Sequence, residues 1–120
     1  MKIYKDKDCI YRLVFNDFEL LVLSRCMGRM PAETKNHAFK YTSKIFMNAN
    51  LFTNINKALK DTHLRTHHTT VSFFSLTNFI RTFDINKYCW FAGERKVMEN
   101  IYNTILKEIR KCNTNFNINN

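Results

Sequence analysis

Three of the four histidines of the chain fall within six positions, in the stretch DTHLRTHHTT that covers residues 61–70. They are His63, His67 and His68, and Arg65 lies between them. An imidazole can ligate a metal, transfer a proton or contact a phosphate, and a guanidinium offers several N–H donors to an anion. The residue types therefore fit three kinds of site: a metal site, an acid–base catalytic site and an anion-binding surface.

A metal site would need His63 and His67 on one helical face, because zinc-binding helices place two histidines four residues apart. A helix that precedes them would have to continue past Asp61 to give this arrangement. The glutamate that zinc proteases carry between such histidines is absent, and Arg65 would place a positive charge beside the cation. The cysteines form no C-x-x-C pair. We therefore predict neither a bound metal nor another cofactor.

Acid–base catalysis is a second interpretation of the same stretch. Two imidazoles can cleave RNA, one as base and the other as acid, while a nearby cation stabilises the charged intermediate. The histidines, together with Arg65, Lys57 and Lys60, supply these residue types. Catalysis also needs a convergent geometry that spacing does not show. A histidine-dependent ribonuclease is therefore the third alternative, and no catalytic residue is assigned.

The distribution of charge favours the anion-binding surface. The formal net charge is +9, from 19 Lys and Arg against 10 Asp and Glu. Residues 34–83 carry seven of these cations, a single acid at Asp61, and all four histidines. A surplus of this kind attracts nucleic acid, anionic lipid or an acidic protein surface. The alternative is that these residues form a solvated face with no ligand.

We predict a small basic nucleic-acid-binding protein that contacts the phosphate backbone through residues 40–70. The predicted contacts are Lys40, Lys44, Lys57, Lys60, His63, Arg65, His67 and His68. Because imidazoles gain protons in mildly acidic solution, affinity for polyanions is expected to rise between about pH 7.5 and about pH 6. The main alternative is an inhibitor or regulator that binds another macromolecule through an apolar patch around Met27, Met30 and Trp90.

Composition disfavours several other classes of protein. No apolar run reaches the roughly 18 residues that a membrane-spanning helix needs, and the charged stretch MKIYKDKD does not resemble a signal peptide. The four cysteines are spread along the chain and are expected to be reduced thiols in an intracellular protein. Two glycines are too few for a glycine-built phosphate loop. The abundance of Lys, Asn, Ile and Phe is typical of an AT-rich genome, such as that of a virus or phage.

The elements that must position these residues are predicted from periodicity and capping signals. Residues 9–15 predict a strand, and a helix at about 17–29 follows it. Asn16 and Glu19 have the spacing of a capping box at the start of this helix. A hairpin that turns at Asn16 and Asp17 is the alternative. Further predicted elements are a helix at about 50–61, a β-prone stretch at 69–75 and a helix at 76–83 capped by Ser75.

The last predicted helix has the clearest pattern. Branched aliphatic residues recur every four positions within 93–112, at Val97, Ile101, Ile105 and Ile109. This spacing is typical of a long amphipathic helix. The Asn-rich residues 113–120 have little to bury and are expected to fray. The fold prediction is one globular α+β domain over residues 1–112, mostly helical, with a small sheet.

Overall fold

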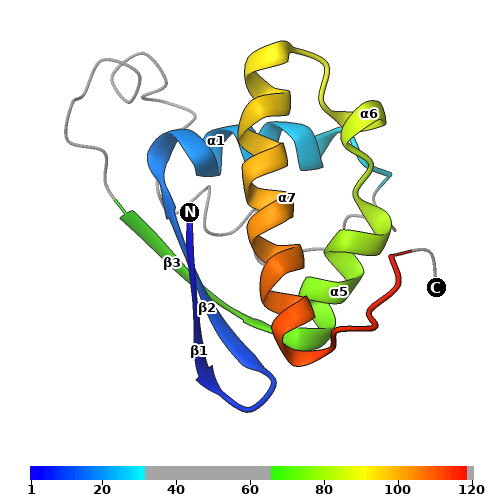
Figure 1. Ribbon diagram of the computed structural model, residues 1–120. Coiled ribbons are helices and arrows are strands. Elements are labelled where there is room, and N and C mark those ends of the chain that lie inside the picture. The colour runs from blue at the N-terminus through cyan, green and yellow to red at the C-terminus, as the bar shows by residue number, and fades with distance from the viewer. Residues whose placement is uncertain (32–65, 119–120) are drawn as a thin grey trace.

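The computed structural model describes residues 1–31 and 66–118 (Figure 1). In chain order the elements are β1 (Lys2–Lys7), β2 (Ile10–Asn16), α1 (Asp17–Gly28), β3 (Thr66–Ser72), α5 (Phe73–Thr82), α6 (Ile85–Tyr88) and α7 (Ala92–Cys112). The strands form one antiparallel sheet in the order β1-β2-β3, and the helices pack against it as one small domain. The predicted α+β class with a small sheet and a long C-terminal helix is confirmed. The helix predicted at about 50–61 lies outside the described residues.

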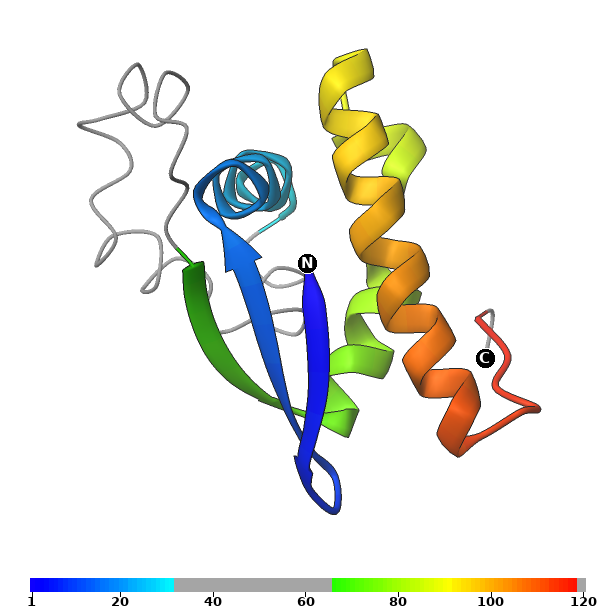
Figure 2. The same ribbon diagram turned by 60° about the vertical axis from the view of Figure 1, so that its left-hand side comes forward.

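The central strand gives the sheet two different faces. Side chains alternate across a strand, and in β2 Tyr11, Leu13 and Phe15 are buried on the side that meets α1 and α7. In Figure 2 the helices lie to one side of the three strands, and no helix of the described residues covers the other side. We call this second side the outer face; it carries Lys2, Tyr4, Arg12, Val14, Thr66, His68 and Thr70.

The turn from β2 into α1 is fixed by a capping box. The Asn16 side-chain oxygen accepts a hydrogen bond from the Glu19 backbone N–H at 2.7 Å, and the Glu19 carboxylate accepts one from the Asn16 N–H at 3.0 Å. A cap of this kind stabilises a helix by about 1 kcal/mol. The predicted helix at about 17–29 and its capping box are confirmed. The alternative hairpin at Asn16 and Asp17 is wrong, because Asp17 is the first residue of α1.

The long helix α7 supplies much of the core. Met98, Ile101, Ile105 and Ile109 have no exposed surface, and α7 packs against α1 and α5. Full burial of such side chains stabilises the fold by about 1.5–3 kcal/mol each. The predicted helix at 93–112 is confirmed. Among the described residues, no helix combines the length and apolar character needed to cross a membrane.

β1 was not predicted from the sequence, and α5 begins three residues earlier than the predicted helix at 76–83. β1 is a mainly charged edge strand, and it forms through its hydrogen bonds to β2 rather than through an apolar pattern of its own. The helix predicted at 76–83 begins at Phe73, because Ser72 is its cap and accepts from the Ser75 N–H at 3.1 Å. The Ser75 cap is therefore wrong.

The segment after α7 contributes to the core at one position. Phe116 is buried, and the Arg81 guanidinium carbon lies 4.6 Å from the centroid of its ring. The expectation that the residues after the last helix bury little is therefore not met at Phe116. Its ring packs against Arg81 of α5, whereas the sequence around it shows only a polar Asn-rich run.

Candidate nucleic-acid interface

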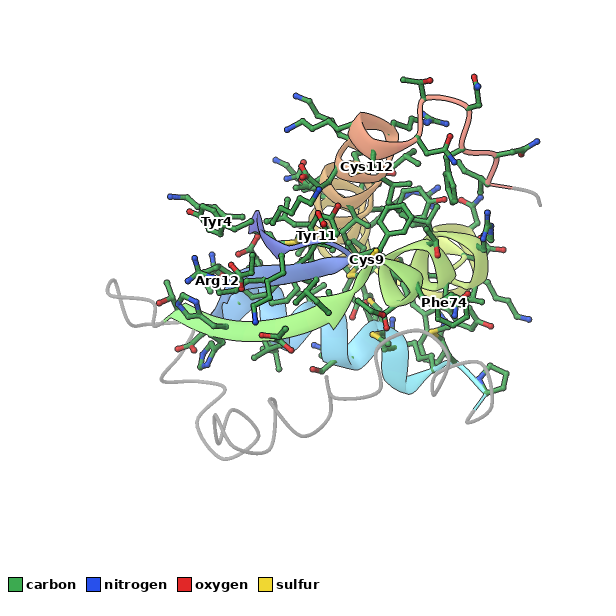
Figure 3. All side chains as sticks on the ribbon, turned by 90° about the horizontal axis from the view of Figure 1, so that it is seen from below. Tyr4, Cys9, Tyr11, Arg12, Phe74 and Cys112 are labelled. Atoms are coloured by element: carbon green, nitrogen blue, oxygen red, sulfur yellow. The ribbon has the colours of Figure 1, made fainter. Side chains whose placement is uncertain are left out.

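The register of the sheet brings Tyr4, Arg12 and His68 together on the outer face. Tyr4 lies opposite Arg12 on the neighbouring strand, and the Arg12 guanidinium carbon is 4.9 Å from the centroid of the Tyr4 ring. Arg12 also donates from Nη1 to Nδ1 of His68 at 3.3 Å, since a guanidinium has no acceptor. Figure 3 shows Tyr4 and Arg12 side by side on the side of the sheet away from α5 and α7.

Among the described residues, Arg12 has few polar partners. Its side chain is 40% exposed, and its Nε is 3.7 Å from a carboxylate oxygen of Asp6. A guanidinium carries five N–H donors in a planar fork. Within the described part of the chain its polar partners are Asp6 and His68, which together engage only part of this fork. A solvent-facing guanidinium against an aromatic ring can bind a phosphate, a planar base or both.

A shallow depression of about 430 Å³ runs along this part of the sheet. Its volume falls within the range of small-ligand sites. Outer-face residues that line it are Lys2, Tyr4, Arg12, Val14, Thr66 and His68. The aromatic ring and Val14 supply apolar surface, while Lys2, Arg12 and His68 supply cationic or N–H groups. Glu19 also lines the depression, and its carboxylate is paired with the N-terminal ammonium group of Met1. This combination suits a ligand that has both a flat apolar part and a negative charge.

The two adjacent histidines of the predicted site do not face the same way. His67 points to the covered side of the sheet, where its Nε2 contacts an oxygen of Asp17 at the start of α1. Asp17 is buried and the His67 side chain is largely so. His68 points to the outer face, because neighbours in a strand project to opposite sides. A ribonuclease pair formed by His67 and His68 is therefore not supported.

The other six predicted contacts lie outside the described residues. They are Lys40, Lys44, Lys57, Lys60, His63 and Arg65. The helical pairing of His63 with His67 is wrong, because His67 belongs to β3, which begins at Thr66. Across residues 1–31 and 66–118, no group of three or more His, Cys, Asp and Glu side chains is arranged to hold a metal.

Three residues that line the depression were not among the contacts predicted from the sequence: Lys2, Tyr4 and Arg12. One signal was present: Arg12 interrupts the apolar run CIYRLVF at a position that alternation assigns to the side opposite Tyr11 and Leu13. Tyr4 had no such signal, because its strand was not recognised. Its place beside Arg12 depends on the pairing of β1 with β2.

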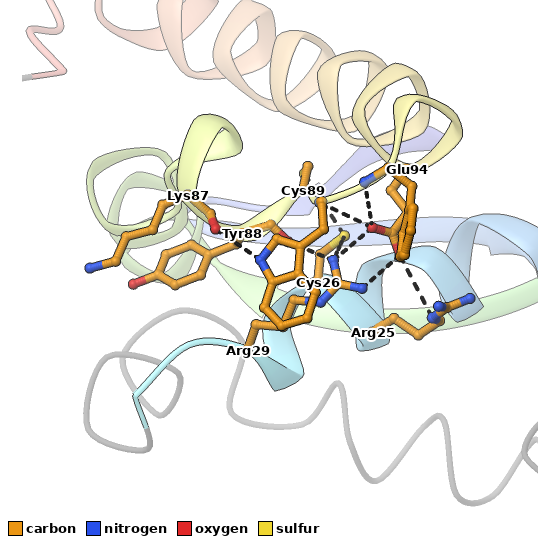
Figure 4. A network of polar contacts seen from close by, with 9 residues as sticks. Arg25, Cys26, Arg29, Lys87, Tyr88, Cys89 and Glu94 are labelled. Carbon is orange, nitrogen blue, oxygen red and sulfur yellow. Dashed lines mark hydrogen bonds and ion pairs between the residues drawn. The ribbon is translucent and has the colours of Figure 1, made fainter.

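A second arginine–aromatic cluster lies at the far end of α1, where Arg29 meets the start of α7 (Figure 4). Arg29 donates to the two carboxylate oxygens of Glu94 at 2.6 and 3.0 Å and to the Tyr88 carbonyl at 2.9 Å. Its guanidinium carbon lies 4.0 Å from the centroid of the Trp90 ring. The hydrogen bonds from Arg29 hold the pKa of Glu94 below its ordinary value, against the effect of burial. We call this set the α1–α7 junction.

Two thiols lie beneath the α1–α7 junction. The sulfur atoms of Cys26 and Cys89 are 3.8 Å apart, and both residues are buried. Burial raises the pKa of Cys26 to about 12, so the nucleophilic thiolate is strongly disfavoured. The four cysteines are free thiols in the structure.

The apolar patch predicted around Met27, Met30 and Trp90 does not exist as a surface. Met27 and Met30 are part of the buried core, whereas the Trp90 side chain is 66% exposed.

Comparison of the chain with family models, curated proteins and solved structures finds no match. The case for a function therefore depends on the outer face and on the charge of the sequence.

Proposed function

We propose that this chain is an intracellular nucleic-acid-binding protein that contacts the phosphate backbone through the outer face of its sheet. The observation that carries the proposal is the row formed by Tyr4, Arg12 and His68 along the depression. Charged and hydroxyl side chains of this kind are the usual contacts to phosphate and sugar. Arg12 is the central contact, because its fork of donors suits the oxygens of a phosphate.

The distribution of charge along the sequence supports this assignment. Residues 32–65 carry six Lys and Arg against two acids, Glu33 and Asp61. This segment enters the sheet at Thr66, which itself lines the depression. A surplus of cations in the sequence favours the binding of a polyanion. The predicted contacts within 40–65 lie outside the described residues and remain predictions from the sequence.

The test measures binding of a fluorescent oligonucleotide by anisotropy while the salt concentration is varied. The affinity should be clear at about 50 mM salt and fall steeply by about 200 mM, because bound cations release counterions from the phosphates. Arg12→Ala should weaken binding several-fold, and the slope of the logarithm of affinity against the logarithm of salt should decrease by about one unit.

Arg95→Ala is the matched control. Arg95 is an exposed arginine on α7 with a carboxylate partner, Glu99, at 3.2 Å, so it resembles Arg12 in type, exposure and pairing. Its loss should leave the affinity and the salt slope unchanged. Absence of binding at low salt, or equal effects of the two substitutions, would overturn the proposal.

One observation favours the protein-binding alternative. Trp90 and Phe91 are both more than half exposed beside the α1–α7 junction, and large exposed rings are common in protein interfaces. A regulator that acts through these rings would lose partner binding in Trp90→Ala and retain it in Arg12→Ala. The nucleic-acid proposal expects the reverse order for an oligonucleotide.

A further inference from the structure

The outer face offers a flat aromatic surface as well as positive charge. The Tyr4 side chain is 42% exposed, although its strand belongs to the folded sheet. The Arg12 guanidinium carbon lies 4.9 Å from the centroid of its ring, so the two side chains form an adjacent pair on the outer face. Aromatic rings and guanidinium planes are the groups on which proteins stack unpaired bases.

The surroundings of the Tyr4–Arg12 pair offer apolar and cationic groups to a nucleotide, and the Glu19 carboxylate that also lines the depression is paired with the N-terminal ammonium group. Val14 supplies an apolar floor on β2, while Lys2 and His68 border the same depression on the two flanking strands. A base placed against Tyr4 and Arg12 would therefore have cationic or N–H groups within the depression for its phosphates. Thr66 adds a hydroxyl that can reach a sugar or phosphate oxygen.

A double helix cannot use this surface in the same way. Its bases are already stacked and paired, and a side chain reaches only their edges in the grooves. The outer face is a sheet surface without a described helix to enter a major groove. Exposed aromatic rings on a sheet stack against unpaired bases, which occur in loops and single strands.

We propose, on the basis of the nucleic-acid-binding function above, that the ligand is a single strand with one base stacked against the Tyr4–Arg12 pair. The base occupies the depression, and the adjoining phosphates contact Lys2, Arg12 and His68. RNA and DNA share this stacking chemistry. The sugar 2′-hydroxyl is the group that can separate them.

The experiment compares three single strands of equal charge, which differ in their bases or their sugar, with a duplex of the same length that carries about twice that charge. Four probes of about 12 nucleotides are titrated by anisotropy: oligo-dT, oligo-rU, an abasic strand and a mixed-sequence duplex. Oligo-dT or oligo-rU should bind about tenfold more tightly than the abasic strand. The duplex should bind more weakly than oligo-dT or oligo-rU despite its higher charge, because its bases are already stacked and paired. The ratio of oligo-rU to oligo-dT then identifies the preferred sugar.

Substitutions at Tyr4 locate the stacking. Tyr4→Ala and Tyr4→Leu should lose about tenfold in affinity for the single strand and leave the abasic affinity unchanged, whereas Tyr4→Phe keeps the ring and the affinity. Tyr4→Leu serves as a second test because a bulky apolar residue preserves the strand if alanine disturbs it. Circular dichroism verifies that each variant is folded. Phe74→Ala is the control, since Phe74 is 71% exposed and lies on α5 away from Tyr4 (Figure 3).

The outcomes separate this inference from the proposed function. Equal binding of base-bearing and abasic strands, with no effect of Tyr4 substitutions, would overturn the stacking inference and leave phosphate binding in place. An equal loss in Phe74→Ala and Tyr4→Ala would also overturn it. Failure of every probe to bind at low salt would overturn the proposed function itself.

Discussion

Two arginines of this chain each lie over an aromatic ring and beside a carboxylate, one on the outer face and one in the α1–α7 junction. The Arg29 side chain is 12% exposed, and its fork meets both oxygens of Glu94 and a backbone carbonyl. Arg12 is 40% exposed and meets a single carboxylate oxygen, of Asp6, at 3.7 Å. The residue types are alike, but among the described residues the Arg29 guanidinium has more hydrogen-bond partners than that of Arg12.

This difference separates a structural role from a binding role. A buried, two-pronged arginine–carboxylate pair fixes the geometry of the elements that carry it, and neither partner has capacity left for a ligand. An exposed pair held at one oxygen contributes little to stability and can exchange its partner for a phosphate. The Arg29 cluster therefore joins α1 to α7, whereas the Arg12 cluster remains available for a ligand.

The largest expected effect follows from removing the carboxylate of the α1–α7 junction. Glu94→Ala should lower the free energy of unfolding by about 3 kcal/mol, because it leaves the Arg29 charge buried without its partner. The N–H groups of Trp90 and Phe91 also lose the oxygen that accepts from them at 3.2 and 3.3 Å. Urea denaturation followed by Trp90 fluorescence and circular dichroism measures the change.

Glu99→Ala is the control for this substitution. Glu99 is a half-exposed glutamate on the same helix, and it pairs with Arg95 at 3.2 Å. An exposed pair of this type is worth less than about 1 kcal/mol. If the two alanine variants unfold at the same urea concentration, the α1–α7 junction does not hold the helices together.

Acidification should weaken the same junction to a smaller extent. The pKa of Glu94 lies below its ordinary value of 4.5, chiefly because of the hydrogen bonds from Arg29. The unfolded chain therefore binds this proton more readily than the folded chain, so stability is present above about pH 4.5 and is lost as the pH falls through the lowered folded-state pKa.

The acid effect can be isolated with Glu94→Gln. Urea denaturation at about pH 5.5 and about pH 3.5 should show a larger loss of unfolding free energy in the parent protein than in the variant, since glutamine cannot titrate. Equal losses in the two proteins would mean that other carboxylates determine the acid sensitivity.

The sequence predicted those elements whose signals are local. The four-residue repeat of Ile101, Ile105 and Ile109 defines α7, and Asn16 with Glu19 defines the start of α1. Both signals lie within a few residues, so no partner from elsewhere in the chain is needed to recognise them. The boundary between β3 and α5 was less certain, because Ser72 and Ser75 are both capable of capping a helix.

Neither the α1–α7 junction nor the candidate site could be predicted in the same way. Arg29 and Glu94 are 65 positions apart, and their contact depends on how α1 packs against α7. Tyr4 reaches Arg12 only because β1 pairs with β2 in one particular register. Among the predicted contacts, His68 reaches this row and His67 does not, since a strand projects adjacent residues to opposite faces.

The smallest expected effect on stability belongs to Arg12, and it decides whether the comparison between the two arginines holds. Arg12→Ala should change the free energy of unfolding by less than about 1 kcal/mol, because the Asp6 pair and the Tyr4 contact are both exposed. The same variant should lose oligonucleotide affinity several-fold, so binding and folding are affected independently. Urea denaturation measures the free energy of unfolding, and fluorescence anisotropy on the same preparation measures the oligonucleotide affinity. If Arg12→Ala unfolds as readily as Glu94→Ala, the outer face is a structural cluster like the α1–α7 junction, and its loss of binding reports a loss of fold.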